Sequence, residues 1–130
     1  MIMKKLNLDI PVIVLITMIL FSCEKDYTSP KKVEVTSLVS FSHDIVPILA
    51  NDCAKSGCHI TGAHTPDLTA ANAYNELTLL GYVDQTNPEG STVYKLITST
   101  SSNKMPPNGS LTPEEIGFIL AWIKQGAQNN

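Results

Sequence analysis

The sequence contains no arginine, and positive charge is scarce along the whole chain. All nine basic residues are lysines, set against twelve acidic residues, and aromatic side chains make up only 6% of the chain. Proteins that bind nucleic acids use basic patches to neutralise phosphates and aromatic side chains to stack on bases. Because this chain has neither a basic stripe nor a cluster of aromatics, nucleic-acid binding is excluded as a function class.

Sustained alternation of apolar and polar residues is also absent, which argues against half-buried β-strands. The apolar residues instead recur at helical spacing in short segments, separated by stretches that contain glycine and proline. A length of 130 residues suits one domain with a modest core. The fold class expected is therefore all α, as one small helical domain.

Long hydrophobic runs are missing except at the start of the chain. After Lys4 and Lys5, residues 10–21 form an apolar run without charge. A membrane-spanning helix needs about 20 apolar residues, so this shorter run behind a charged start indicates a secretory signal. We expect a signal peptide over residues 1–22 and an exported protein.

The apolar run ends in the letters LFSC, residues 20–23, which resemble the lipobox of bacterial lipoproteins. In that family the signal is cut before the cysteine, so the resemblance implies that Cys23 carries lipid. The letters EKD that follow resemble the surface-export signal of Bacteroidetes lipoproteins. Residues 23–40 are mostly polar and are expected to form a flexible tether. The expected location is membrane-anchored, in the periplasm or on the outer cell surface.

The clearest helix signal lies near the end of the chain. Thr112 is expected as the N-cap, with Pro113 at the first helical position and Glu115 completing a capping box. Gly126 is expected to stop this helix. Its apolar residues recur at helical spacing, so one face of the helix should be buried.

Three further helices are expected between residue 41 and this last one. The first should start near Asp44 and run into Cys53, and two others should follow N-caps at Thr69 and Ser91. The helix after Thr69 is expected to stop at Gly81. Four short helices leave little core, and domains of this size often need a metal or a large cofactor to complete their interior.

Cysteine is scarce too, yet two of the three cysteines, Cys53 and Cys58, stand just before His59. A disulfide between them would leave His59 without a role. A zinc site needs four ligands, and these three with His43 or His64 supply them, although adjacent ligands turn poorly onto one ion. A haem can instead take two thioethers at its edge and an imidazole at its iron, usually through Cys-x-x-Cys-His. Here four residues separate the cysteines.

The segment FSHDIVPILANDCAKSGCH, residues 41–59, resembles the start of a class I cytochrome c domain. The resemblance is to the version with wider Cys-x4-Cys-His spacing, found in exported Bacteroidetes proteins. It implies one covalent haem c, with Cys53 and Cys58 forming the thioethers and His59 as the proximal iron ligand. Gly57 would let the longer loop turn beneath the haem edge.

The segment NKMPPNGSLTPEEIGFILAWIKQGA, residues 103–127, resembles the part of class I cytochromes c in which a methionine before prolines is the distal iron ligand. The resemblance implies this role for Met105, in a loop that the two following prolines stiffen. His43 is interpreted as an exposed residue at a helix start and His64 as a loop residue. Distal ligation is the alternative role for each histidine.

Taken together, the two segments imply that residues 41–130 form a cytochrome c-like domain with one haem. The function implied is one-electron transfer between redox proteins, a donor and an acceptor, with the membrane bound through the lipid anchor. Because both axial positions would be filled, the chain is expected to be an electron carrier and not an enzyme. The alternatives are a zinc-stapled surface binding module, and a haem sensor or peroxidase if Met105 does not ligate iron.

Overall fold

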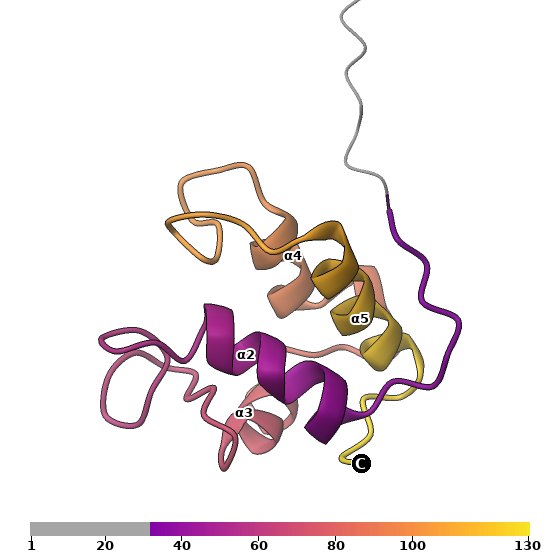
Figure 1. The fold of residues 1–130 in the computed structure, drawn as a ribbon, viewed down its shortest axis with the longest axis horizontal. Helices are drawn as coiled ribbons and strands as arrows, with labels where there is room; N and C mark the ends of the chain where they lie inside the picture. The colour runs from indigo at the N-terminus through magenta and orange to yellow at the C-terminus, as the bar shows by residue number, and fades with distance from the viewer. Residues whose placement is uncertain (1–31) are drawn as a thin grey trace, which may run out of the picture.

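The computed structural model describes residues 32–130. The expected signal peptide, the lipidation site at Cys23 and the first part of the tether lie outside this range. Within residues 32–130 the secondary structure is helical and contains no strand, which confirms the all-α class (Figure 1). Over the same range, no helix has the length and apolar character needed to cross a membrane.

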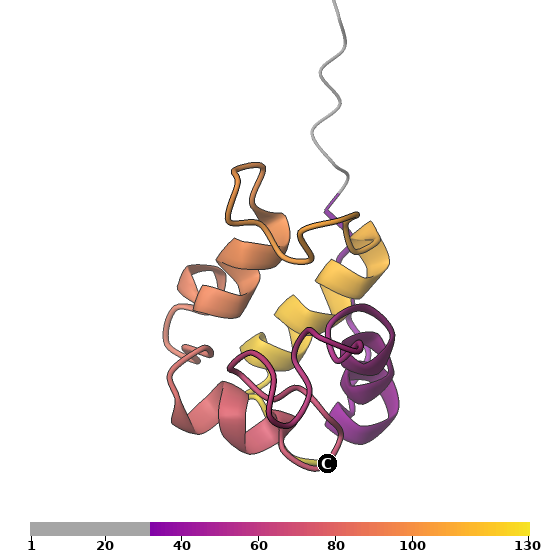
Figure 2. The same ribbon diagram turned by 90° about the vertical axis from the view of Figure 1, so that its left-hand side faces the viewer.

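The described chain contains four α-helices and two short helical turns. In chain order these are the π-helical turn η1 (Phe41–Ile45), α2 (Val46–Asp52), α3 (Ala73–Leu79), the 3-10 turn η2 (Pro88–Gly90), α4 (Thr92–Thr98) and α5 (Pro113–Lys124). In the two perpendicular views, α5 lies between α4 on one side and α2 with η1 on the other (Figures 1 and 2). The loops that follow α2 and α4 both lie at the same end of the molecule, on the left-hand side of Figure 1.

Helix α5 begins as its sequence predicts. The Thr112 hydroxyl accepts a hydrogen bond from the Glu115 backbone N–H at 3.2 Å, and the Glu115 carboxylate accepts one from the Thr112 N–H at 2.7 Å. This reciprocal pair is the expected capping box. The helix ends at Lys124, and Gly126 follows in the left-handed region with φ of +94°. Both ends of α5 are therefore set by local residues.

Of the three other helices, two start at positions other than those expected. The first helical segment starts at Phe41 and not near Asp44, because the Asp44 carboxylate accepts from the Ser40 N–H and the Ser40 hydroxyl accepts from the His43 N–H. Helix α3 starts at Ala73 and not directly after Thr69, since the Thr69 side chain is bonded to a neighbouring aspartate. Ser91 is the N-cap of α4, as predicted.

The core is built around the buried face of α5. The Trp122 ring is 1% exposed and lies 5.1 Å, centroid to centroid, from the ring of Phe41. Phe41 in turn makes an edge-on contact with Tyr74 of α3 at 5.4 Å. The indole N–H of Trp122 donates to the carbonyl of Gln128 at 2.9 Å, so this buried polar atom is satisfied. One aromatic cluster thus joins η1, α3 and α5.

Residues 32–40, the later part of the expected tether, pack against α5. Val39 is 2% exposed, and Val33 crosses so close to Gly117 that a Cβ there would lie 2.7 Å from the Val33 carbonyl oxygen. Glu89 of η2 accepts from the amines of Lys32 at 2.6 Å and Lys124 at 3.4 Å. These contacts fix where the chain joins the helical body.

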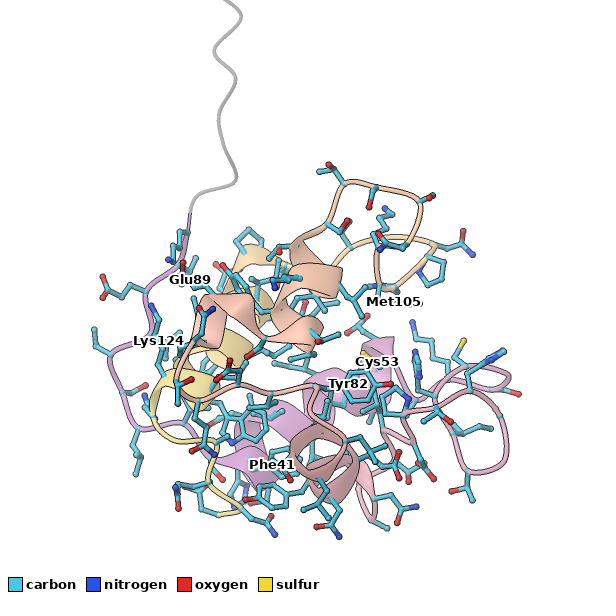
Figure 3. All side chains as sticks on the ribbon, turned by 180° about the vertical axis from the view of Figure 1, so that it is seen from behind. Phe41, Cys53, Tyr82, Glu89, Met105 and Lys124 are labelled. Atoms are coloured by element: carbon cyan, nitrogen blue, oxygen red, sulfur yellow. The ribbon has the colours of Figure 1, made fainter. Side chains whose placement is uncertain are left out.

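Glu89 and Lys124 lie on one side of the molecule, and Cys53 and Met105 lie on the other (Figure 3). Hydrogen bonds from Lys32 and then Lys124 hold the pKa of the Glu89 carboxyl below its ordinary value. Because the carboxyl is exposed to solvent, such a pair contributes little to stability. The pair lies on the side of the domain where residues 32–40 attach, opposite the cysteines.

Candidate functional site

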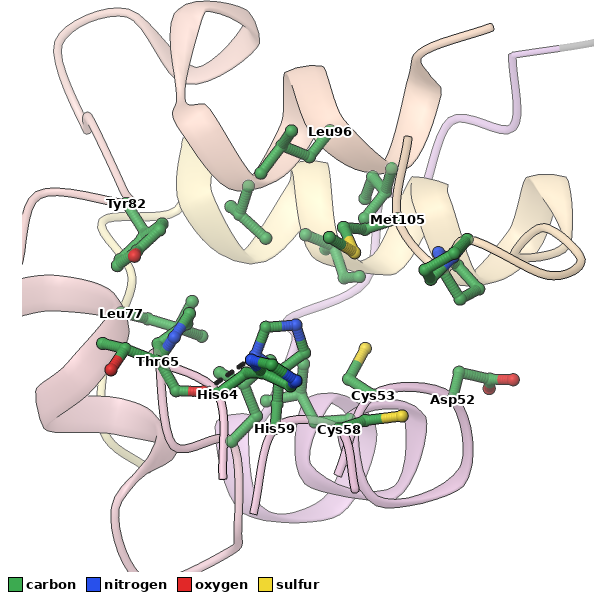
Figure 4. A pocket seen from close by; sticks show the side chains of 18 of the residues that line it. Asp52, Cys53, Cys58, His59, His64, Thr65, Leu77, Tyr82, Leu96 and Met105 are labelled. Atoms are coloured by element: carbon green, nitrogen blue, oxygen red, sulfur yellow. Dashed lines mark hydrogen bonds between the residues drawn. The ribbon is translucent and has the colours of Figure 1, made fainter. Parts of the chain in front are cut away.

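A cavity of about 520 Å³ separates two walls of the domain (Figure 4). One wall consists of α4, α5 and the loop that precedes α5, and the other of α2, α3 and the loop after α2. Most of the lining surface is apolar, and seven aliphatic side chains contribute to it, those of Leu49, Leu68, Leu77, Val93, Leu96, Ile97 and Ile119. Cofactor sites are typically apolar cavities of about 300–1,000 Å³ with a few placed polar groups. This cavity has that size and character.

The cavity brings together the residues that the sequence singled out. Cys53, Cys58, His59 and Met105 all line it, although Met105 is distant from the others along the chain. His64 lines it as well. His43 does not, because it is exposed on η1, as expected for a residue at a helix start.

The loop from Cys53 to His59 is a compact turn that follows α2. Cys53 is the C-cap of α2, its N–H donating to the Leu49 carbonyl. The N–H of His59 donates to the Cys53 carbonyl at 3.1 Å, which closes the loop on itself. Gly57 has φ of +78°, a left-handed conformation that glycine adopts without strain. The turn expected at Gly57 is therefore present.

The two thiols differ in their surroundings. Both are free, so the disulfide considered from the sequence is not formed in the described structure. Burial, with a smaller contribution from the neighbouring carboxylate of Asp52, raises the pKa of the Cys53 thiol to about 11. Cys58 is exposed at the cavity rim. Cys53 is thus a neutral thiol at pH 7, directed into the cavity (Figure 4).

His59 is oriented by a backbone carbonyl that the sequence analysis did not single out. Its Nδ1 lies 3.0 Å from the carbonyl oxygen of Pro66, which is buried. A carbonyl can only accept, so Nδ1 carries the proton and Nε2 keeps its lone pair. An imidazole held in this way is a preformed metal ligand. No local sequence signal marks Pro66, because the contact depends on how the intervening loop folds.

Asp67 organises the loop that presents Pro66. Its carboxylate accepts from the hydroxyls of Thr61 and Thr69, both at 2.6 Å, from the Thr69 N–H at 3.0 Å and from the Asn72 amide at 2.8 Å. These hydrogen bonds hold the pKa of the Asp67 carboxyl far below its ordinary value, the bond from Thr61 contributing most. The carboxylate therefore stays ionised at neutral pH, at the centre of this loop.

Met105 lies on the wall that faces His59. Its N–H donates to the carbonyl of Leu96 at the end of α4, at 3.0 Å, which fixes the start of the Met-Pro-Pro loop. In the close view its sulfur points into the cavity, whereas the rings of His59 and His64 both lie on the opposite wall (Figure 4). Met105 and His59 thus face each other across the cavity, whereas His64 lies on the same wall as His59.

The zinc hypothesis needs Cys53, Cys58 and His59 with a second histidine around one ion. Within residues 32–130, no group of three or more His, Cys, Asp or Glu side chains lies close enough to hold a metal ion together. Cys53, Cys58, His59 and His64 lie on the same wall of the cavity without coming close enough to share one ion.

The arrangement suits a broad, flat and apolar group. Two thiols lie at one end of the cavity, Tyr82 lies at the other, and an imidazole and a thioether face each other across the middle (Figure 4). A haem has this shape, and in other proteins thiols attach a haem while imidazole and thioether groups ligate its iron. No protein-family model, no curated protein and no solved structure matches the chain.

Proposed function

We propose that the protein is a mono-haem c-type cytochrome that carries out one-electron transfer. The observation that supports this is that Cys53, Cys58, His59 and Met105 line one apolar cavity of cofactor size. A small core with few buried residues would also gain from a large apolar cofactor. Haem, when bound, supplies the exchange of one electron between the ferric and ferrous states of its iron.

Each of the four residues has a distinct role in this proposal. Cys53 and Cys58 would form the thioethers that attach the haem, and Nε2 of His59 would be one ligand of its iron. Met105, on the facing wall, would supply the other ligand through its thioether. The aliphatic side chains between them exclude water, and methionine ligation paired with histidine favours a relatively high reduction potential.

The same ligand set argues for an electron carrier and against an enzyme. If His59 and Met105 both held the iron, they would leave no open position on it for a substrate. The partners proposed are therefore a redox protein that donates an electron and another that accepts it. We further propose that lipid on Cys23, outside the described residues, holds the domain at a membrane, in the periplasm or at the cell surface.

The attachment of haem tests the proposal. The full chain is produced in a host that matures c-type cytochromes, denatured, and stained for haem on a gel. We expect the wild-type polypeptide to retain haem, and Cys53→Ala combined with Cys58→Ala to lose it. Ser56→Ala, an exposed change inside the same loop, should retain haem and serves as the matched control.

Two results would contradict the proposal. One is a wild-type chain that contains stoichiometric zinc and no haem, which would favour the zinc-stapled module. The other is haem that leaves the wild-type polypeptide on denaturation, which would show that the cysteines form no thioethers.

A further inference from the structure

We propose that Asp67 is a positioning residue, which sets the hydrogen bond between the Pro66 carbonyl and His59 and thereby tunes the iron that His59 ligates. The inference rests on the proposed function. Asp67 does not ligate the iron in this proposal, and it acts only through the loop that carries Pro66.

The first step concerns the peptide unit between Pro66 and Asp67. Its carbonyl accepts from Nδ1 of His59 at 3.0 Å, and its N–H, on the Asp67 side, donates to the carboxylate of Glu76 on α3 at 3.2 Å. A peptide unit is planar, so a bond at each end fixes the direction in which the carbonyl points. The placement of the Asp67 backbone, together with its hydrogen bond to Glu76, therefore orients the Pro66 carbonyl toward His59.

The second step concerns what holds Asp67 in place. Its carboxylate joins Thr61, which precedes Pro66 in the loop, to Thr69 and Asn72, which follow it. The loop is thus closed across its base by one side chain. Next to it, the N–H of Leu68 donates to the carbonyl of His59 at 2.8 Å, which ties this loop directly to the proximal residue.

The third step concerns the consequence for iron. A hydrogen bond from Nδ1 to an acceptor fixes the orientation of a ligating imidazole and raises its basicity at Nε2. A more basic ligand stabilises the ferric state, so a well-placed Pro66 carbonyl lowers the reduction potential. If Asp67 is removed, this bond should weaken, the potential should rise, and the Nδ1 proton of His59 should become accessible to solvent.

Asp84 offers a matched control within the same chain. Its carboxylate makes a similar set of bonds, accepting from the Thr86 N–H at 2.9 Å, the Thr86 hydroxyl at 2.7 Å and the Asn87 N–H at 3.1 Å. That turn has no hydrogen bond to His59 or to its loop in the described structure. Asp84→Ala therefore removes one carboxylate and the hydrogen bonds of its turn. It should leave the hydrogen bond between His59 and Pro66 unchanged.

Thr61→Val gives a second, milder test. It removes one bond to Asp67 and leaves the carboxylate charge in place, so a change in this variant cannot come from charge alone. It also keeps the proposal testable if Asp67→Ala does not fold.

The experiment uses the haem-loaded full chain in three variants, Asp67→Ala, Thr61→Val and Asp84→Ala. The reduction potential is measured by titration, and exchange of the His59 Nδ1 proton by NMR of the ferrous protein. We expect Asp67→Ala to raise the potential and to speed this exchange several-fold, Thr61→Val to do both to a smaller extent, and Asp84→Ala to do neither.

Haem-loaded Asp67→Ala with wild-type potential and wild-type exchange would overturn the inference, as would equal changes in Asp84→Ala. Both results leave the proposed function standing. Failure of the wild-type chain to bind haem would instead overturn the proposed function itself.

Discussion

Among the individual residues, Met105 is the one on which the proposed redox function depends most at the distal side of the haem. His43 and His64 were the alternative candidates for the distal position, and neither lies opposite His59 in the structure. His43 is exposed and outside the cavity, and His64 lies on the same wall as His59. Of the three candidates for the distal position, Met105 is the one whose side chain lies on the wall facing His59.

We therefore predict that Met105→Ala lowers the reduction potential, by on the order of 0.1 V within the roughly 0.8 V range that axial ligands cover. It should also open the iron to added imidazole or cyanide, and abolish the thioether-to-iron charge-transfer band of the ferric protein. His64→Ala should do none of these. A spectrum that changes in His64→Ala or His43→Ala and not in Met105→Ala would instead establish a bis-histidine iron.

The residue scale also shows why the site could be predicted only in part. Cys53, Cys58 and His59 stand together in the sequence, so their grouping is local and visible in the letters. Met105 became a candidate only through a family resemblance. The Pro66 carbonyl was missed, because a backbone acceptor has no residue signature and its position depends on the bonds made by Asp67.

Among the structural elements, those that depend on neighbouring residues matched the prediction best. The start of α5 is set by Thr112 and Glu115, which are three positions apart, and the capping box is present as expected. The start of α3 is also influenced by a local contact, because Asp67, two residues before Thr69, accepts hydrogen bonds from the Thr69 hydroxyl and N–H, and the helix begins only at Ala73. A turn between neighbouring residues thus competed with the helix start that capping preference placed at Thr69.

The loop between the cysteines yields a prediction at this scale. Gly57 has φ of +78° and open space around it, so Gly57→Ala should cost only the backbone strain, about 1–2 kcal/mol in the free energy of unfolding. Because this strain falls on the loop that aligns Cys53 with Cys58, the yield of covalent haem should also fall. Chemical denaturation and haem staining measure the two effects.

Gly62→Ala is the control for that prediction. Gly62 has φ of +80° and is equally open, but it lies beyond His59. The two variants should lose similar stability, while only Gly57→Ala reduces haem attachment. Equal losses of attachment in both would show that general destabilisation, and not the cysteine loop, limits maturation.

At the scale of the whole molecule, the packed segment before Phe41 joins the helical body to the expected anchor. Residues 32–40 hold four apolar residues, Val33, Val35, Leu38 and Val39, but their packing was not predicted because it depends on the shape of α5. Gly117 leaves the space that Val33 crosses, and Val39 is buried in the core. Such a fit between distant segments has no local pattern.

The anchor itself gives the last prediction. Cys23→Ser should leave the exported chain without lipid and move it from the membrane fraction to the soluble fraction, since acyl chains contribute about 0.8 kcal/mol per buried CH₂. Cys58→Ser, which removes a cavity thiol, should leave membrane association unchanged. If Cys23→Ser remains in the membrane fraction, an uncleaved membrane-spanning signal holds the protein there.

The attachment side and the cavity lie on opposite sides of the domain, with Lys32 and Glu89 at one and Cys53 and Met105 at the other. Between Cys23 and Lys32 the chain can extend at most about 30 Å, at about 3.3–3.6 Å per residue. A lipid-anchored form would therefore be tethered close to the membrane and could not diffuse through its compartment. Its cavity side would face away from the point of attachment. Electron exchange would then be limited to redox partners that are themselves held near the same membrane.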